Sequence, residues 1–78
     1  MAYFYIILLM KYSYYKFKTV IHGLETLYYR IKNDKFIEIY HPKLERWERS
    51  LVFRDIKDFK KHRGMKRITK KQLFLELL

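Results

Sequence analysis

The sequence has 78 residues, enough for one domain, and a chain of this length buries only about 60% of its unfolded surface when it folds. Half of the residues are apolar and 19% are aromatic, which excludes a disordered chain, and the absence of cysteine excludes disulfide scaffolds, cysteine nucleophiles and thiolate metal sites. The formal net charge of +10 at pH 7 indicates polyanionic partners. We predict a single domain over residues 1–78.

Residues 2–10, AYFYIILLM, form the most apolar stretch of the chain. A membrane-spanning helix needs about 20 apolar residues, and Lys11 ends this run after nine. A signal peptide carries positive charge before its apolar run, whereas here Lys11 and Lys16 follow it. The run therefore predicts a buried strand in a soluble, cytoplasmic protein. Translation that starts at Met10 would remove the run and stays an alternative.

The Tyr, Ile, Phe and Val content of residues 3–22 favours strand over helix. Twenty residues are long for one strand, and no glycine or proline interrupts them. We expect either a bulge or bend near residues 11–13 or two strands with a poorly marked turn. His22 and Gly23 end the segment.

A hairpin is the clearest element of the sequence. Two alternating runs flank residues 33–35, which begin with the turn-forming pair Asn-Asp. A three-residue loop pairs Ile31 with Ile37 and Arg30 with Glu38, so that one face becomes apolar, whereas a two-residue loop mixes polar and apolar residues on both faces. The pattern predicts the three-residue loop, built as a type I turn with a bulge.

Pro42 cannot donate a hydrogen bond and therefore ends the second strand of the hairpin. Residues 44–49 carry Trp47 and predict a short third strand, or a loop that packs on the sheet. The fold class is therefore α+β, with a small antiparallel sheet of three to four strands over about residues 3–49.

Two helices are expected to follow this sheet, both on one of its faces. Ser50 is a suitable N-cap for a helix over about residues 51–63, and Gly64 suits the left-handed position after its end. The apolar face of this helix carries Val52, Ile56 and Phe59. Thr69 with Gln three residues later forms a capping box that opens a last helix over about residues 70–78.

Basic residues are concentrated near the end of the sequence. Residues 1–50 hold nine basic and five acidic residues (net +4), whereas residues 51–78 hold nine basic and three acidic residues (net +6). Such a run fits phosphate backbones, although lysine-rich sequences also place lysine on any solvated face. We name this set the basic ridge and predict that it binds nucleic acid. Its members are Arg54, Lys57, Lys60, Lys61, Arg63, Lys66, Arg67, Lys70 and Lys71.

A second candidate surface combines aromatic and basic side chains. Aromatic rings beside cations on a sheet can stack single-stranded bases, and Trp47 could also anchor a protein interface. Ordinary cross-strand pairing, or cover by another element, explains the same pattern and is the favoured interpretation. The six residues of this set are Tyr28, Arg30, Lys32, Phe36, Tyr40 and Trp47.

Motifs for catalysis are weak. The three histidines share no metal-ligand spacing, and the two glycines are too few for a phosphate-binding loop. We predict no metal, no cofactor and no enzymatic activity. A small toxin-type ribonuclease stays as the enzymatic alternative, because four residues could act as its acid, base and charge-stabilising groups. They are Arg30, Tyr40, His41 and Lys43.

The sequence as a whole predicts a small non-enzymatic protein that binds nucleic acid, DNA or RNA, or a nucleic-acid-bound machine. One alanine, two glycines and much Lys, Ile, Tyr and Phe are typical of an AT-rich genome, which fits an accessory protein of a phage or mobile element. The alternative is an inhibitor that binds a host nucleoprotein or nuclease, in which the positive charge mainly steers encounter.

Overall fold

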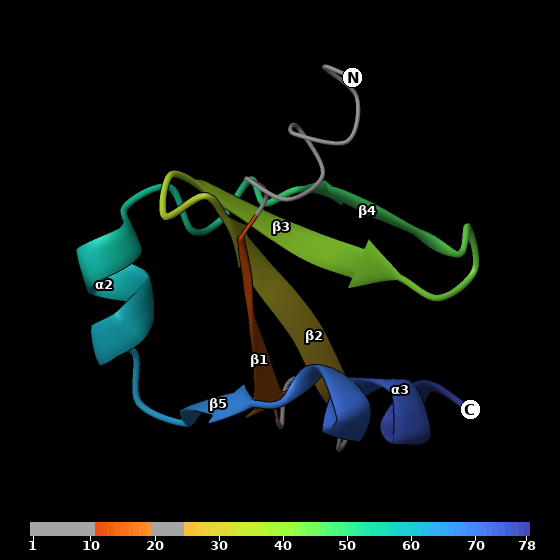
Figure 1. Ribbon diagram of the computed structural model, residues 1–78. Coiled ribbons are helices and arrows are strands. Elements are labelled where there is room, and N and C mark those ends of the chain that lie inside the picture. Colours follow the sequence, from red (N-terminus) through yellow and green to blue (C-terminus); the bar gives the residue numbers. More distant parts are fainter. Residues whose placement is uncertain (1–10, 20–24) are drawn as a thin grey trace.

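The computed structural model describes residues 11–19 and 25–78 and contains a five-stranded antiparallel sheet of order β4-β3-β2-β1-β5 with two helices (Figure 1). The α+β class is confirmed, with one strand more than the three to four predicted. The strand predicted for residues 2–10 and the segment end at His22 and Gly23 lie outside the described residues. The elements are β1 (Tyr12–Thr19), β2 (Glu25–Lys32), β3 (Phe36–His41), β4 (Arg46–Arg49), α2 (Ile56–Lys61), β5 (Met65–Ile68) and α3 (Lys70–Leu77).

Strand β1 lies between β2 and β5 and pairs with β2 along its whole length. The pairing runs without interruption from Tyr12 opposite Lys32 to Thr19 opposite Glu25. A bulge at residues 12 or 13, one of the two sequence alternatives, is therefore absent from this described strand. Because the pairing is regular, alternate side chains of β1 point to the same face of the sheet along the whole strand.

The hairpin of β2 and β3 has the predicted register, with Ile31 opposite Ile37 and Arg30 opposite Glu38. The predicted type I turn is wrong. Asn33 and Asp34 have φ angles of 52° and 56°, the left-handed values that a type I′ turn requires at both central positions. A type I′ turn matches the twist of the flanking strands, and Asn and Asp tolerate this backbone conformation better than most residues.

The core lies on the sheet face that α2 covers, which we name the α2 face. Phe59 of α2 is fully buried, and its ring meets Tyr15 at 5.0 Å and Tyr29 at 5.4 Å between ring centroids, both edge to face. Ile31 and Ile37 complete this buried cluster. Burial of a phenylalanine side chain contributes about 1.5–3 kcal/mol, so Phe59 is the main attachment of α2 to the sheet.

Helix α2 is shorter than predicted and begins at Ile56 instead of residue 51. The Asp55 carboxylate caps it by accepting from the backbone N–H groups of Lys57 and Asp58. The backbone N–H of Ser50, the residue after β4, donates to the carbonyl of Ile37 at 2.8 Å, and Val52 is 81% exposed instead of packed. The predicted helix cap at Ser50 is wrong: its hydroxyl accepts from the backbone N–H of Phe53 at 3.1 Å, but this bond closes a turn, because residues 51–55 are not helical.

Strand β5 is not among the predicted elements: its residues Lys66 and Arg67 fall between the two predicted helices. β5 pairs with β1, with Arg67 opposite Tyr15 and Lys66 opposite Lys16. A four-residue strand with two charges has no local strand signal, and it forms because β1 supplies its hydrogen-bond partners. Gly64 has the predicted left-handed conformation (φ 90°), but it lies in the turn from α2 to β5.

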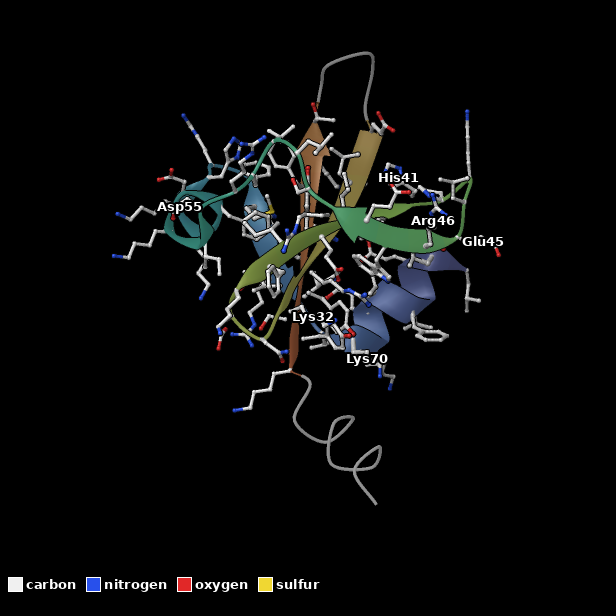
Figure 2. All side chains as sticks on the ribbon, turned by 90° about the horizontal axis from the view of Figure 1, so that it is seen from above. Lys32, His41, Glu45, Arg46, Asp55 and Lys70 are labelled. Atoms are coloured by element: carbon white, nitrogen blue, oxygen red, sulfur yellow. The ribbon has the colours of Figure 1, made fainter. Side chains whose placement is uncertain are left out.

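The two helices lie on opposite faces of the sheet, so the prediction of a shared face is wrong. Phe59 of α2 contacts Tyr15, whereas Glu76 of α3 contacts Lys16, and neighbouring residues of a strand point to opposite faces. Figures 1 and 2 show α2 and α3 on opposite sides of β1, with Asp55 beside α2 and Lys70 beside α3. The chain crosses from one face to the other through β5. The predicted cap of α3 is confirmed, because the Thr69 hydroxyl accepts from the backbone N–H of Gln72 at 3.1 Å.

Candidate nucleic-acid interface

The basic ridge wraps around the β5 edge of the sheet. Its members lie just before and on α2, in the turn at residues 62–64, on β5 and in the first turn of α3. All nine side chains are exposed. Because α2 and α3 cover opposite faces and β5 lies between them in the chain (Figure 1), the ridge turns around the edge and does not form a flat patch on one face.

Three lysines of the ridge share the outer side of α2. Lys57, Lys60 and Lys61 are spaced three and four residues apart, which places them on one helix face. Phe59, by contrast, points into the core. Lys60 and Lys61 also lie in the last turn, where positive charge stabilises the helix dipole by about 0.3–1 kcal/mol. Lys60 and Lys61 thus stabilise α2 slightly, in addition to any role in binding.

On β5 the ridge turns the edge of the sheet. Lys66 and Arg67 are neighbours in the strand and point to opposite faces. Lys66 lies opposite Lys16, a like-charge pair that destabilises a sheet. The carboxylate of Glu76 contacts the Lys16 ammonium at 3.2 Å and reduces this repulsion, whereas Lys66 faces solvent without an ion-pair partner among the described residues.

None of the nine ridge side chains forms an ion pair within residues 11–19 and 25–78. The ion pairs of this part of the chain use four other basic residues, and Asp55, one of the two acidic residues inside the ridge, caps α2. The paired basic residues are Lys16, Arg30, His41 and Arg46. The positive charge of the ridge is therefore not neutralised by the described part of the chain.

The six residues of the second candidate surface all lie on the sheet face that α3 covers, the α3 face. Tyr40 lies opposite Trp47, and Lys32 lies opposite Phe36. Tyr14 of β1 joins this set, with its ring centroid 6.2 Å from that of Trp47. Tyr14 was not predicted as part of this surface, because its place in the sheet depends on the β1–β2 register, which no local pattern gives. Its i, i+2 spacing from Tyr12 was the only signal in the sequence.

Arg30 is fully engaged by its neighbours on the α3 face. Its Nε donates to the Glu38 carboxylate at 2.6 Å. The guanidinium carbon lies 4.4 Å from the centroid of the Tyr12 ring and 4.6 Å from that of Trp47. Each cation–π contact contributes about 0.5–2 kcal/mol. Arg30 thus joins β1, β2, β3 and β4, and this structural role leaves it unsuited to hold a ligand.

Glu76 links α3 to the sheet. Its carboxylate accepts from the Tyr28 hydroxyl at 3.2 Å as well as from Lys16. Desolvation raises the pKa of Glu76, but hydrogen bonds from Lys16, Gln72 and Tyr28 outweigh it and hold the pKa below its usual value. Desolvation and then the nearby Glu76 charge raise the pKa of Tyr28. Tyr28 is therefore a contact of α3 and not an open stacking surface.

A groove separates α3 from the aromatic part of the α3 face. It has a volume of about 330 Å³, with Tyr14, Tyr40 and Trp47 on its sheet side and Phe74 and Leu77 on its helix side. Lys70, a member of the basic ridge, lies at its border. A second hollow of about 370 Å³ adjoins it, shares Tyr14 and Lys70, and includes Arg67. We name the first hollow the aromatic groove.

The four residues of the ribonuclease alternative do not share one surface. His41 follows Tyr40 in β3 and points to the opposite face, where its ring nitrogen lies 3.1 Å from the Glu48 carboxylate. Lys43 lies in the turn between β3 and β4, and Arg30 is held by Glu38. In the described part of the chain, no group of three or more His, Asp or Glu side chains is arranged to hold a metal ion.

Neither described helix is both long and apolar enough to cross a membrane. No protein-family model, curated protein or solved structure matches the chain.

Proposed function

We propose that this protein binds the phosphate backbone of nucleic acid through the basic ridge, as a non-enzymatic protein inside the cell. One observation carries the proposal: nine exposed cations, running from Arg54 to Lys71, form no ion pair within the described residues. The composition typical of an AT-rich genome supports an accessory role in a phage or mobile element, acting on nucleic acid or on a machine that carries it.

Phosphate binding accounts for ridge positions that are unfavourable for the stability of the fold. Lys70 and Lys71 lie in the first turn of α3, where positive charge opposes the helix dipole. Lys66 faces Lys16 across the strands, which is also unfavourable. A polyanion turns both costs into favourable interactions, because each neutralised phosphate releases counterions into solution. Proteins that bind in this way lose affinity steeply as salt increases.

The test compares two double charge reversals with the same effect on net charge. Lys60→Glu with Lys61→Glu changes the ridge, whereas Lys35→Glu with Lys43→Glu changes exposed lysines outside it. Each pair lowers the formal net charge from +10 by four, to +6. We expect the ridge pair to weaken binding to labelled RNA or DNA at least tenfold, or about 1.4 kcal/mol, and more than the control pair does.

Equal losses in the two pairs would contradict the proposal, since net charge alone would then explain binding. No detectable binding by the unchanged protein at low salt would reject it outright. In both measurements, unchanged circular dichroism of the variants ensures that the loss comes from the surface and not from unfolding.

A protein partner is the second candidate, and the exposed apolar side chains of α3 favour it. Phe74 and Leu75 of α3 are 65% and 63% exposed, and Leu78, directly after the helix, is 95% exposed. As an inhibitor of a nucleoprotein or nuclease, the protein would use the ridge mainly to steer encounter, so ridge variants would slow association with little change in dissociation. Changes at Trp47 or Phe74 would then speed dissociation.

A further inference from the structure

We propose that the aromatic groove holds an unpaired base of a single-stranded nucleic acid whose phosphates lie on the basic ridge. The inference rests on the proposed function and adds to it the class of nucleic acid. It depends on three features: the aromatic rings on one side of the groove, the exposed ring on its other side, and the ridge lysine at its border.

The sheet side of the groove is a cluster of rings. The Trp47 ring centroid lies 5.2 Å from that of Tyr40 and 6.2 Å from that of Tyr14, at interplanar angles of 57° and 53°. All three residues are partly exposed and line the groove. Every nucleobase offers a flat π face, and stacking on such rings contributes about fivefold to 150-fold in affinity per base.

The α3 side of the groove carries one further aromatic ring, that of Phe74. Phe74 lines the groove but is 65% exposed, and Leu77 beside it is 37% exposed. The volume of about 330 Å³ is in the range of small-molecule sites. A base in the groove would cover apolar surface on both the sheet and α3. Filling of the groove would therefore remove from water a face of α3 that the described chain leaves open.

Positive charge beside the groove favours nucleic acid as its ligand. Lys70 borders both the aromatic groove and the adjoining hollow, and that hollow also includes Arg67. A strand that follows the ridge along β5 to α3 thus reaches the groove with a cation beside it. Duplex nucleic acid does not fit this site, because its bases are stacked and paired inside the helix, whereas single strands can splay a base outwards.

The experiment uses three probes of equal length: a single-stranded oligothymidine or oligouridine, an abasic strand with the same backbone, and a duplex. Trp47 is the only tryptophan of the protein, so its fluorescence reports directly on the groove. We expect the intact single strand to quench Trp47 and to bind about fivefold to 150-fold more tightly than the abasic strand. The thymidine and uridine arms show whether DNA, RNA or both are accepted.

Phe74→Ala tests the groove without risk to the fold, because the side chain is mostly exposed. It should remove most of the preference for the intact strand over the abasic strand. Leu51→Ala is the matched control, since Leu51 is 82% exposed but lies before α2, away from the groove. It should keep the full preference. Tyr40→Phe retains the ring and should also keep it.

The failures of the two proposals are distinguishable. Equal affinity for intact and abasic strands, with binding still dependent on Lys60 and Lys61, would overturn the groove but leave the ridge. An absence of binding to every probe would overturn both. Quenching of Trp47 by an apolar peptide and not by the single strand would assign the groove to a protein partner and would also overturn the inference.

Discussion

Helices α2 and α3 attach to opposite faces of the sheet by different interactions. α2 inserts Phe59, which is completely buried among Tyr15 and Tyr29. α3 buries only Leu73 and is otherwise held by the contacts of Glu76 with the sheet. Their outer surfaces also differ: α2 presents lysines, whereas α3 has lysines only in its first turn and presents apolar side chains beyond it.

Under the proposed function, this difference assigns stability to the α2 face and binding to the outside of α2 and to the α3 face. The α2 face supplies the dry aromatic core, so the lysines on the outside of α2 are free to serve a partner. The α3 face keeps polar contacts and a groove, and α3 covers it only in part. The β5 edge joins the two, which brings free positive charge next to accessible rings.

The largest effect is expected from truncation of the two phenylalanines, one on each helix. Phe59→Ala should lower the free energy of unfolding by about 3–5 kcal/mol, since it leaves a cavity in the core. Such a loss is a large part of the 5–15 kcal/mol typical of whole proteins. Phe74→Ala should change stability by less than about 0.5 kcal/mol. Urea denaturation followed by circular dichroism measures both, and similar losses would show that α3 belongs to the core.

A smaller effect is expected from the two paired arginines. Arg30→Met should lower the free energy of unfolding by about 1–3 kcal/mol, because it breaks two cation–π contacts and leaves Glu38 without its partner in a half-buried site. Arg46→Met should cost less than about 0.5 kcal/mol, because the Arg46–Glu48 pair is exposed. The same denaturation experiment distinguishes them. A loss of nucleic-acid affinity in Arg30→Met, without unfolding, would contradict the structural role assigned to Arg30.

The smallest effect concerns the attachment of α3 at low pH. The pKa of Glu76 is lowered in the folded protein, so its contribution to stability is present above the unfolded pKa and is lost as pH falls through the folded pKa. At a pH below the usual pKa range of a glutamate, Glu76 is protonated, and Lys16 and Tyr28 no longer bind a charged carboxylate. The protection of the α3 amides, which is the intrinsic exchange rate relative to the observed rate at the same pH, should therefore decrease there in the unchanged protein. Glu76→Gln should already exchange faster at neutral pH and show a weaker pH dependence.

Local chemistry accounts for the features that the sequence predicted well. The face pattern around residues 33–35 fixed the hairpin register, and Thr69 with Gln72 marked the start of α3. The concentration of charge in the ridge and the exposure of its side chains also follow from the sequence, because charge density needs no tertiary information, whereas its binding role stays a prediction. These features depend on residues within a few positions of one another.

Contacts between distant parts of the chain account for the errors. β5 exists because β1 pairs with it, and no pattern within Met65–Ile68 announces this. Because the chain crosses the edge of the sheet through β5, α3 lies on the other face. The sequence prediction assumed that two consecutive helices pack on the same face. The aromatic groove needs Tyr14 from β1, Trp47 from β4 and Phe74 from α3, so sequence reasoning found only part of it.

The most direct test of the central claim counts the ridge cations that contact phosphate. Binding of a labelled strand is measured at several salt concentrations for the unchanged protein and for Lys60→Gln with Lys61→Gln. The slope of log affinity against log salt concentration should become shallower by about 1.4, since each lysine that neutralises a phosphate of a single strand contributes about 0.7 to the slope. An unchanged slope would show that these lysines do not contact the backbone and would contradict the account.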